Sequence, residues 1–143
     1  MIKGLKLKHK LVGLALLLAV PLGTTANSDT KCLAEAIYHE ARGEPYLGML
    51  AVAQVVINRM RSPGFPGTIC GVVYQPGQFS WTKTKTRQMN VHAVYVADIA
   101  LSGEHELKHF RATYFHNHKV KPRWNNLEKV KVIGRHTFYK EKQ

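Results

Sequence analysis

The sequence lacks the residue patterns that nucleophilic and metal-dependent catalysis require. Its 143 residues include two cysteines, and these do not form the CxxC pair that is typical of zinc sites. No serine stands in a G-x-S-x-G turn, so a serine hydrolase is disfavoured. His39-Glu40 begins like the zinc motif HExxH, but Gly43 stands where the second histidine is required. We predict no catalytic metal and no cofactor; the remaining ligand candidates, which more often pack or face solvent, are His116, His118 and His136.

Acidic residues are scarce as well. Nine Asp and Glu residues stand against 21 Lys and Arg residues, which gives a formal net charge of +12. This excess indicates a solvated basic surface or attraction to a polyanion, such as a cell-wall polymer or an anionic membrane. Nucleic acid would fit the charge alone, but the export predicted next argues against it.

The first 26 residues follow the pattern of a secretory signal peptide. Four lysines and no acid precede the uncharged run from Leu11 to Val20, and small residues follow at 24–26. The run is shorter than the roughly 20 residues of a membrane span, although an uncleaved anchor or a buried first helix is an alternative. We predict that residues 1–26 are removed on export, that no membrane span remains, and that residues 27–143 form one domain in the periplasm or outside the cell.

Export affects the interpretation of the two cysteines. In an oxidising compartment Cys32 and Cys70 could form a disulfide, which would stabilise the fold by about 3–4 kcal/mol on a loop-entropy model. The alternative is two buried free thiols.

Apolar residues recur at helical spacing in three segments, from Cys32 to Gly43, from Tyr46 to Met60 and from Asn90 to Leu101. Thr68 to Tyr74 is too short to assign to a strand or a helix. The C-terminal segments 112–116, 130–134 and 136–139 alternate like short strands. The pattern predicts an α+β fold, mainly helical, as a single domain with a small C-terminal β portion.

Glu40 is the candidate catalytic residue. It shares a helical face with Leu33, Ala36 and Ile37, so it should point inward, where desolvation raises a carboxyl pKa toward the range of a general acid. A buried acid bonded to backbone or to Arg42 is the alternative. Two further acids are not expected to be catalytic. Glu35 should be solvated, and Glu44 could pair with Arg42 or cap the next helix.

Polar and aromatic side chains near this acid are candidates for substrate binding. Gln54 and Asn58 interrupt the apolar second helix, either as site residues or as core amides that satisfy backbone groups. The loop from Gln75 to Trp81 combines amides, a hydroxyl and aromatics, a composition that is typical of binding loops.

Three blocks of the sequence resemble the bacterial cell-wall hydrolases that include the spore cortex-lytic enzymes. The first covers residues 36–45, Gly48 and 51–59; the second covers 73–80; the third covers 112–116, Trp124 and 133–139. The resemblance implies a lysozyme-like, mainly helical domain that cleaves peptidoglycan glycan strands, with its catalytic Glu at Glu40. The third block differs in carrying His116 and His118 beside a basic stretch, and the 143 residues include no wall-binding repeat.

We therefore predict that residues 27–143 are a cell-wall hydrolase catalytic domain that acts as a monomer on peptidoglycan. One Glu would suffice for a lytic transglycosylase, because the C6 hydroxyl of N-acetylmuramic acid can attack C1 and give a 1,6-anhydro product. The alternatives are a non-catalytic peptidoglycan-binding or morphogenesis protein on the same fold, and a cationic membrane-active protein. The predicted substrate-binding residues are Asn58, Gln78, Phe79, Ser80, Tyr114 and Trp124.

Overall fold

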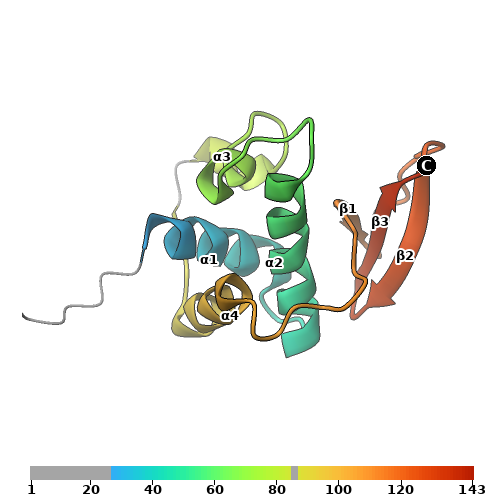
Figure 1. The fold of residues 1–143 in the computed structure, drawn as a ribbon. Helices are drawn as coiled ribbons and strands as arrows, with labels where there is room; N and C mark the ends of the chain where they lie inside the picture. The colour runs from blue at the N-terminus through green and yellow to red at the C-terminus, as the bar shows by residue number, and fades with distance from the viewer. Residues whose placement is uncertain (1–26, 85–86) are drawn as a thin grey trace, which may run out of the picture.

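A computed structural model describes residues 27–84 and 87–143 (Figure 1). The predicted signal peptide lies outside the described residues and stays a prediction. Helices come first along the chain and a small sheet comes last, which confirms the mainly helical α+β fold. The elements are α1 (Ser28–Ala41), α2 (Tyr46–Arg61), α3 (Ile69–Val73), the short 3-10 helix η1 (Ser80–Thr84), α4 (Val91–Ser102), β1 (Tyr114–Asn117), β2 (Leu127–Ile133) and β3 (His136–Glu141).

Helix α1 begins and ends where the local sequence dictates. The Asn27 side chain accepts the backbone N–H of Asp29 and caps the first turn. The helix ends at Ala41, and Gly43 then adopts a φ of 83°, a left-handed conformation that costs glycine little. This turn brings Pro45 to the N-cap of α2, so the two helices are joined by four residues.

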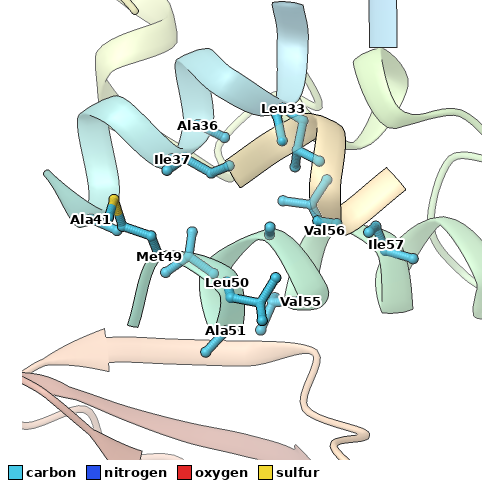
Figure 2. Packing of buried hydrophobic residues seen from close by; sticks show 14 of the residues in the cluster. Leu33, Ala36, Ile37, Ala41, Met49, Leu50, Ala51, Val55, Val56 and Ile57 are labelled. Carbon is cyan, nitrogen blue, oxygen red and sulfur yellow. The ribbon is translucent and has the colours of Figure 1, made fainter. Parts of the chain in front are cut away.

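Helix α2 is the centre of the molecule and is buried almost all round, as its apolar sequence predicts. It lies between the other helices and the sheet (Figure 1). Leu33 and Ile37 of α1 are fully or almost fully buried against it, and Ala51 lies on the side of α2 that faces the strands (Figure 2). Because α2 contributes to both contacts, it fixes the position of the sheet relative to α1.

The segment that the sequence left open, residues 68–74, folds as the short helix α3. The Thr68 side chain accepts the backbone N–H of Gly71 and so caps its first turn. Cys70 of α3 forms a disulfide with Cys32 of α1, with the two Cα atoms 5.3 Å apart. The predicted pairing is therefore present, and it attaches α3 to α1.

The sheet has the strand order β1-β3-β2, with both pairs antiparallel. Alternate residues point to opposite faces of a strand. Phe115 and Phe138, which are cross-strand partners, pack against the helical core. Tyr114 and Tyr139, also cross-strand partners, lie on the opposite face, which we call the outer face of the sheet.

Glu44 connects the helices to the sheet. Its carboxylate is buried and accepts the backbone N–H of Arg135 at 3.0 Å and Nε–H of the same residue at 2.6 Å. Neither alternative predicted for Glu44 is observed within the residues that the structure describes. Arg42 lies over the ring of Tyr38 at 4.9 Å, and the N-cap of α2, Pro45, has no side-chain capping bond. Gly134 lies so close that a Cβ there would overlap the Glu44 carboxylate, and its φ of 57° favours glycine as well.

Candidate active site

Glu40 occupies the last turn of α1 and lines a cleft of about 360 Å³. Helix α2 contributes Arg59 to this cleft and β1 contributes Phe115. The loop before η1 contributes residues 77–79, and η1 contributes Ser80 and Lys83. Glu40 is the one carboxylate among the described residues that line it. Side chains from α1, α2, the segment 77–83 and the sheet therefore meet around a single acid.

Trp81 holds the Glu40 carboxylate. Its indole Nε1–H donates to Glu40 Oε1 at 3.0 Å. The same indole stacks on His39 with ring centroids 4.3 Å apart and on Phe79 at 5.9 Å. Because the indole is fixed on two sides, it constrains the carboxylate to one orientation.

Arg59 supplies a buried positive charge beside Glu40. Its Nε–H donates to the carbonyl of Thr113 at 2.6 Å, and its guanidinium lies 5.4–5.7 Å from the rings of Phe65, Phe79 and Tyr114. Its Nη1 is buried without a hydrogen-bond partner in the described part of the chain. The aromatic rings thus provide much of the surroundings of this cation, at the seam between helices and sheet.

The electrostatic balance at Glu40 favours the protonated acid. Burial raises its pKa, while the hydrogen bond from Trp81 and the positive charge of Arg59 oppose that rise without cancelling it. A carboxyl group with a raised pKa retains its proton closer to neutral pH. Glu40 is therefore suited to donate a proton, as the sequence predicted from its helical face.

Glu35 differs from its expected state. It is 3% exposed, and it accepts a hydrogen bond from the Tyr74 hydroxyl. Burial raises its pKa, opposed by the charge of Arg87. The prediction of a solvated Glu35 is wrong because helical spacing could not reveal that α3 covers this side of α1. Glu35 does not line the Glu40 cleft in the described structure.

Three of the predicted substrate-binding residues line the cleft together, and they are Gln78, Phe79 and Ser80. Phe79 is 5% exposed, so it supports the cleft wall more than it offers a free ring face. Sequence reasoning did not select Arg59, Lys83 or Phe115, which also line the cleft. An arginine inside the otherwise apolar run of α2 was the signal that could have identified Arg59.

The other predicted site residues lie elsewhere. Asn58 donates to the carbonyls of Phe110 and Ala112 and accepts from Gln54, so these amides hold the connection between α4 and β1. Trp124 precedes β2 and lies against the outer face of the sheet, where it contacts Tyr114 at a centroid distance of 6.1 Å. Tyr114 approaches the Arg59 guanidinium but is not among the lining residues.

A larger cavity, of about 640 Å³, lies between the end of α2 and residues 103–111. Both acids that line it, Glu104 and Glu106, are exposed, and Glu106 forms an ion pair with Arg61 at 2.9 Å. Within residues 27–84 and 87–143, no three His, Cys, Asp or Glu side chains come close enough to hold a metal ion. His116 and His136 lie on opposite faces of the sheet. The smaller cleft at Glu40 is therefore the better candidate for acid catalysis.

A family model and two similar curated proteins indicate the same family. A model of the family described as cell wall hydrolase matches residues 43–139, a range that starts three residues after Glu40. A spore cortex-lytic enzyme of Halalkalibacterium halodurans is 36% identical over 130 residues, or 83% of this chain and 36% of that protein. The spore cortex-lytic enzyme of Bacillus subtilis is 48% identical over 58 residues, or 41% of this chain and 19% of that protein.

Two solved structures share the fold. The catalytic domain of the germination-specific lytic transglycosylase SleB from Bacillus anthracis superposes with a TM-score of 0.71 at 35% identity, covering 85% of this chain and all of that one. The catalytic domain of the Bacillus cereus SleB protein gives a TM-score of 0.70 at 34% identity, covering 78% of this chain and 89% of that one. The chain thus matches catalytic domains over most of their length, but it spans only about a third of the Halalkalibacterium enzyme.

Proposed function

This chain belongs to the cell wall hydrolase family, and we propose that it cleaves the glycan strand of peptidoglycan as a lytic transglycosylase, with Glu40 as its one catalytic acid. The observation that carries the proposal is the Glu40 carboxyl group, which lies in a cleft, held by Trp81, with a raised pKa. The likeness to a catalytic domain that bears the name of a lytic transglycosylase supports the reaction type.

In the first step Glu40 donates its proton to the glycosidic oxygen. The bond between C1 and that oxygen breaks, and the leaving sugar departs as an alcohol. Glu40 becomes a carboxylate at this point. The charge of Arg59 and the hydrogen bond from Trp81 both lower the pKa of Glu40, so they stabilise the carboxylate that the step creates.

In the second step the same carboxylate acts as a base. The C6 hydroxyl of the N-acetylmuramic acid residue attacks C1, and Glu40 takes the proton that this hydroxyl loses. The product ends in a 1,6-anhydro ring, no water is consumed, and Glu40 recovers its starting protonation. Gln78 and Ser80, which line the cleft, are the residues that we propose to hydrogen-bond the sugar.

Plain hydrolysis would require a second carboxylate to activate water. The first candidates, Asp98 and Glu44, have other partners. Asp98 accepts a hydrogen bond from Thr30 at 2.9 Å, and Glu44 is paired with Arg135. Neither lines the Glu40 cleft, which supports a mechanism with one acid.

The Glu40→Gln variant tests the assignment. Gln preserves shape and hydrogen bonding but has no proton to donate, so we expect a rate on purified peptidoglycan roughly 10²–10⁴-fold lower, with folding retained. Glu35→Gln is the matched control, because Glu35 is a second buried acid of the same helix that lies outside the cleft lining. Loss of activity in Glu35→Gln alone would reject Glu40 as the acid.

The products test the second step. Mass spectrometry of borohydride-treated muropeptides should show anhydro ends, about 20 mass units below the reduced hydrolytic product. Reducing ends alone would indicate hydrolysis. Binding to peptidoglycan with no cleavage product would support the alternative function, a non-catalytic binding or morphogenesis protein.

We infer that the protein acts at the cell wall, outside the cytoplasm, after removal of residues 1–26. The support is the family and the sequence pattern of the N-terminus. None of the helices in the described part is both long and apolar enough to cross a membrane. N-terminal sequencing of exported protein should give a start near Asn27. The monomeric state stays a prediction, which sedimentation would check.

A further inference from the structure

Four rings gather on the outer face of the sheet, opposite to the face that carries Phe115 of the Glu40 cleft. They belong to Tyr114, His116, Trp124 and Tyr139, and we call this set the aromatic platform. Trp124 contacts the other three at centroid distances of 5.4–6.1 Å. The His116 ring stacks on Tyr139 and its Nε2 hydrogen-bonds the Tyr139 hydroxyl at 3.0 Å. These contacts fix the rings in place, so the platform is preorganised.

The platform is partly open to solvent, because the rings of Tyr114, His116 and Tyr139 are half-buried and Trp124 is more exposed. Trp124 is 37% exposed, and two further large apolar side chains of this region are also exposed, Val120 at 49% and Val132 at 56%. Val132 is the cross-strand partner of Thr137, which shares the face of Tyr139. A soluble domain gains nothing from exposing such a group of apolar side chains together, so the patch indicates an interaction surface.

Positive charge predominates around the platform, although the carboxylate of Glu141 accepts a hydrogen bond from the Tyr114 hydroxyl at 3.1 Å. Residues 114–143 contain eight Lys and Arg residues and two Glu residues. Lys129 is the cross-strand partner of Tyr139, which places it on the platform face, and Lys121 and Arg123 immediately precede Trp124 along the chain. The partner must therefore be acidic as well as able to stack on aromatic rings.

We propose that the aromatic platform binds a stretch of peptidoglycan glycan strand outside the cleft, and this rests on the proposed function. The C–H faces of sugar rings stack on aromatic rings, whose faces are negative. The carboxylates of the stem peptides complement the lysines around the platform. No other polymer of the wall need be invoked, because one glycan strand with its peptides supplies both properties.

The platform borders the cleft through one strand. Phe115 of β1 lines the cleft, while its neighbours Tyr114 and His116 belong to the platform. The Tyr114 ring also lies 5.7 Å from the guanidinium of Arg59, which lines the cleft. The two surfaces therefore adjoin at β1, and a long strand can occupy both while a short fragment fills the cleft alone.

The test is binding to purified sacculi in the Glu40→Gln background, where cleavage does not interfere. Trp124→Ala should weaken binding roughly 3–10-fold, the usual worth of one ring contact. The matched control is Tyr95→Ala, which removes a 57% exposed aromatic ring from α4. Lys129→Glu should weaken binding, and reduce its dependence on salt, more than Lys31→Glu does. This control makes the same charge change at an exposed position of α1. Circular dichroism confirms folding of each variant, and Lys129→Glu leaves all four rings intact.

Ligand length separates the platform from the cleft. The loss of affinity for Trp124→Ala should grow from a tetrasaccharide to long strands. An equal loss at every length, or a loss no larger than for Tyr95→Ala, would overturn the proposal. Binding is measured without cleavage, so the two proposals can fail separately. If binding depends on the platform but the wild type cleaves no peptidoglycan, the proposed function is rejected. If the wild type cleaves peptidoglycan but binding does not depend on the platform, the platform proposal is rejected.

Discussion

The helical region, residues 27–113, and the sheet region, residues 114–143, differ in charge and in burial. The helical region has nine Lys and Arg residues and seven Asp and Glu residues, whereas the sheet region has eight and two. Most of the buried apolar side chains belong to the helices, and the sheet contributes Leu127, Ile133 and Phe138. One part of the molecule is thus close to neutral and well packed, and the other is thin and basic.

The difference separates two physical requirements. A proton donor such as Glu40 needs desolvation, which a packed and nearly neutral frame provides. Attraction to an acidic polymer needs exposed positive charge, which would destabilise a packed core but is tolerated on a thin sheet. The sheet then depends on specific attachments to the helices, of which Glu44 with Arg135 is the clearest.

The largest expected effect concerns the disulfide, which lies wholly in the helical region. Replacing both Cys32 and Cys70 by Ser should lower the free energy of unfolding by about 3–4 kcal/mol, because the open chain regains the entropy of a loop with a sequence separation of 38. Urea denaturation of wild type and double variant measures the difference. A free energy of unfolding equal in the two proteins would show that packing of α3 on α1 suffices.

The next effect should divide the two regions. Glu44→Gln removes the negative charge of the side chain that accepts hydrogen bonds from the backbone N–H and Nε–H of Arg135. The free energy of unfolding should fall by about 1–3 kcal/mol. Hydrogen exchange should increase more for amides of β2 and β3 than for amides of α1. Equal increases in both regions would show that the sheet unfolds only together with the helices.

The Glu44 effect should also depend on pH. Burial alone would raise the pKa of Glu44, but hydrogen bonds from Arg135 and the charges of Arg135 and His136 together lower it. A lowered folded-state pKa means that the stabilisation is present above the unfolded value and is lost as pH falls through the folded value. The difference in stability between wild type and Glu44→Gln should therefore shrink in acid below pH 4.5, the ordinary pKa of a Glu side chain.

The smallest expected effect concerns the boundary between the helices and the sheet, where the charge of Arg59 changes the pKa of Glu40. Its charge lowers the pKa of Glu40, and activity that needs protonated Glu40 declines as pH rises through that pKa. Arg59→Met should therefore move the high-pH limb of kcat/KM to higher pH, while Arg59→Lys, which retains the charge, should move it less. If the high-pH limb shifts equally in Arg59→Met and Arg59→Lys, or in neither, the charge of Arg59 does not act on Glu40 and the residue serves packing alone.

Local sequence patterns were sufficient to predict the three long helices, α1, α2 and α4. The expected helix from Tyr46 to Met60 is observed as Tyr46–Arg61, and the one expected from Asn90 is observed as Val91–Ser102 with Asn90 as its N-cap. Apolar periodicity and capping residues are local, so the sequence carries them directly. The five residues of α3 were too few for a period to be visible, and its assignment required the packing of the fold.

Contacts between distant residues were the part that the sequence could not supply. The inward direction of Glu40 was predictable from its own helix, but its bond to Trp81 spans 41 residues. Glu35 was placed in solvent because its partner Tyr74 lies 39 residues away. Trp124 was expected in the groove, and only its ring contacts with Tyr114 and Tyr139 place it on the outer face of the sheet. Its role as a binding residue stays a proposal.

The chain has two tryptophans, and each region contains one of them. Indole fluorescence can therefore observe the two surfaces separately once the other tryptophan is replaced by Phe. In Trp124→Phe the emission comes from Trp81, whose hydrogen bond to Glu40 makes its intensity sensitive to the protonation of that acid. In Trp81→Phe the emission comes from the half-open Trp124, and a ligand that covers its ring should shift the spectrum to shorter wavelength. A titration of each variant would then give occupancy of cleft and platform in solution without a label.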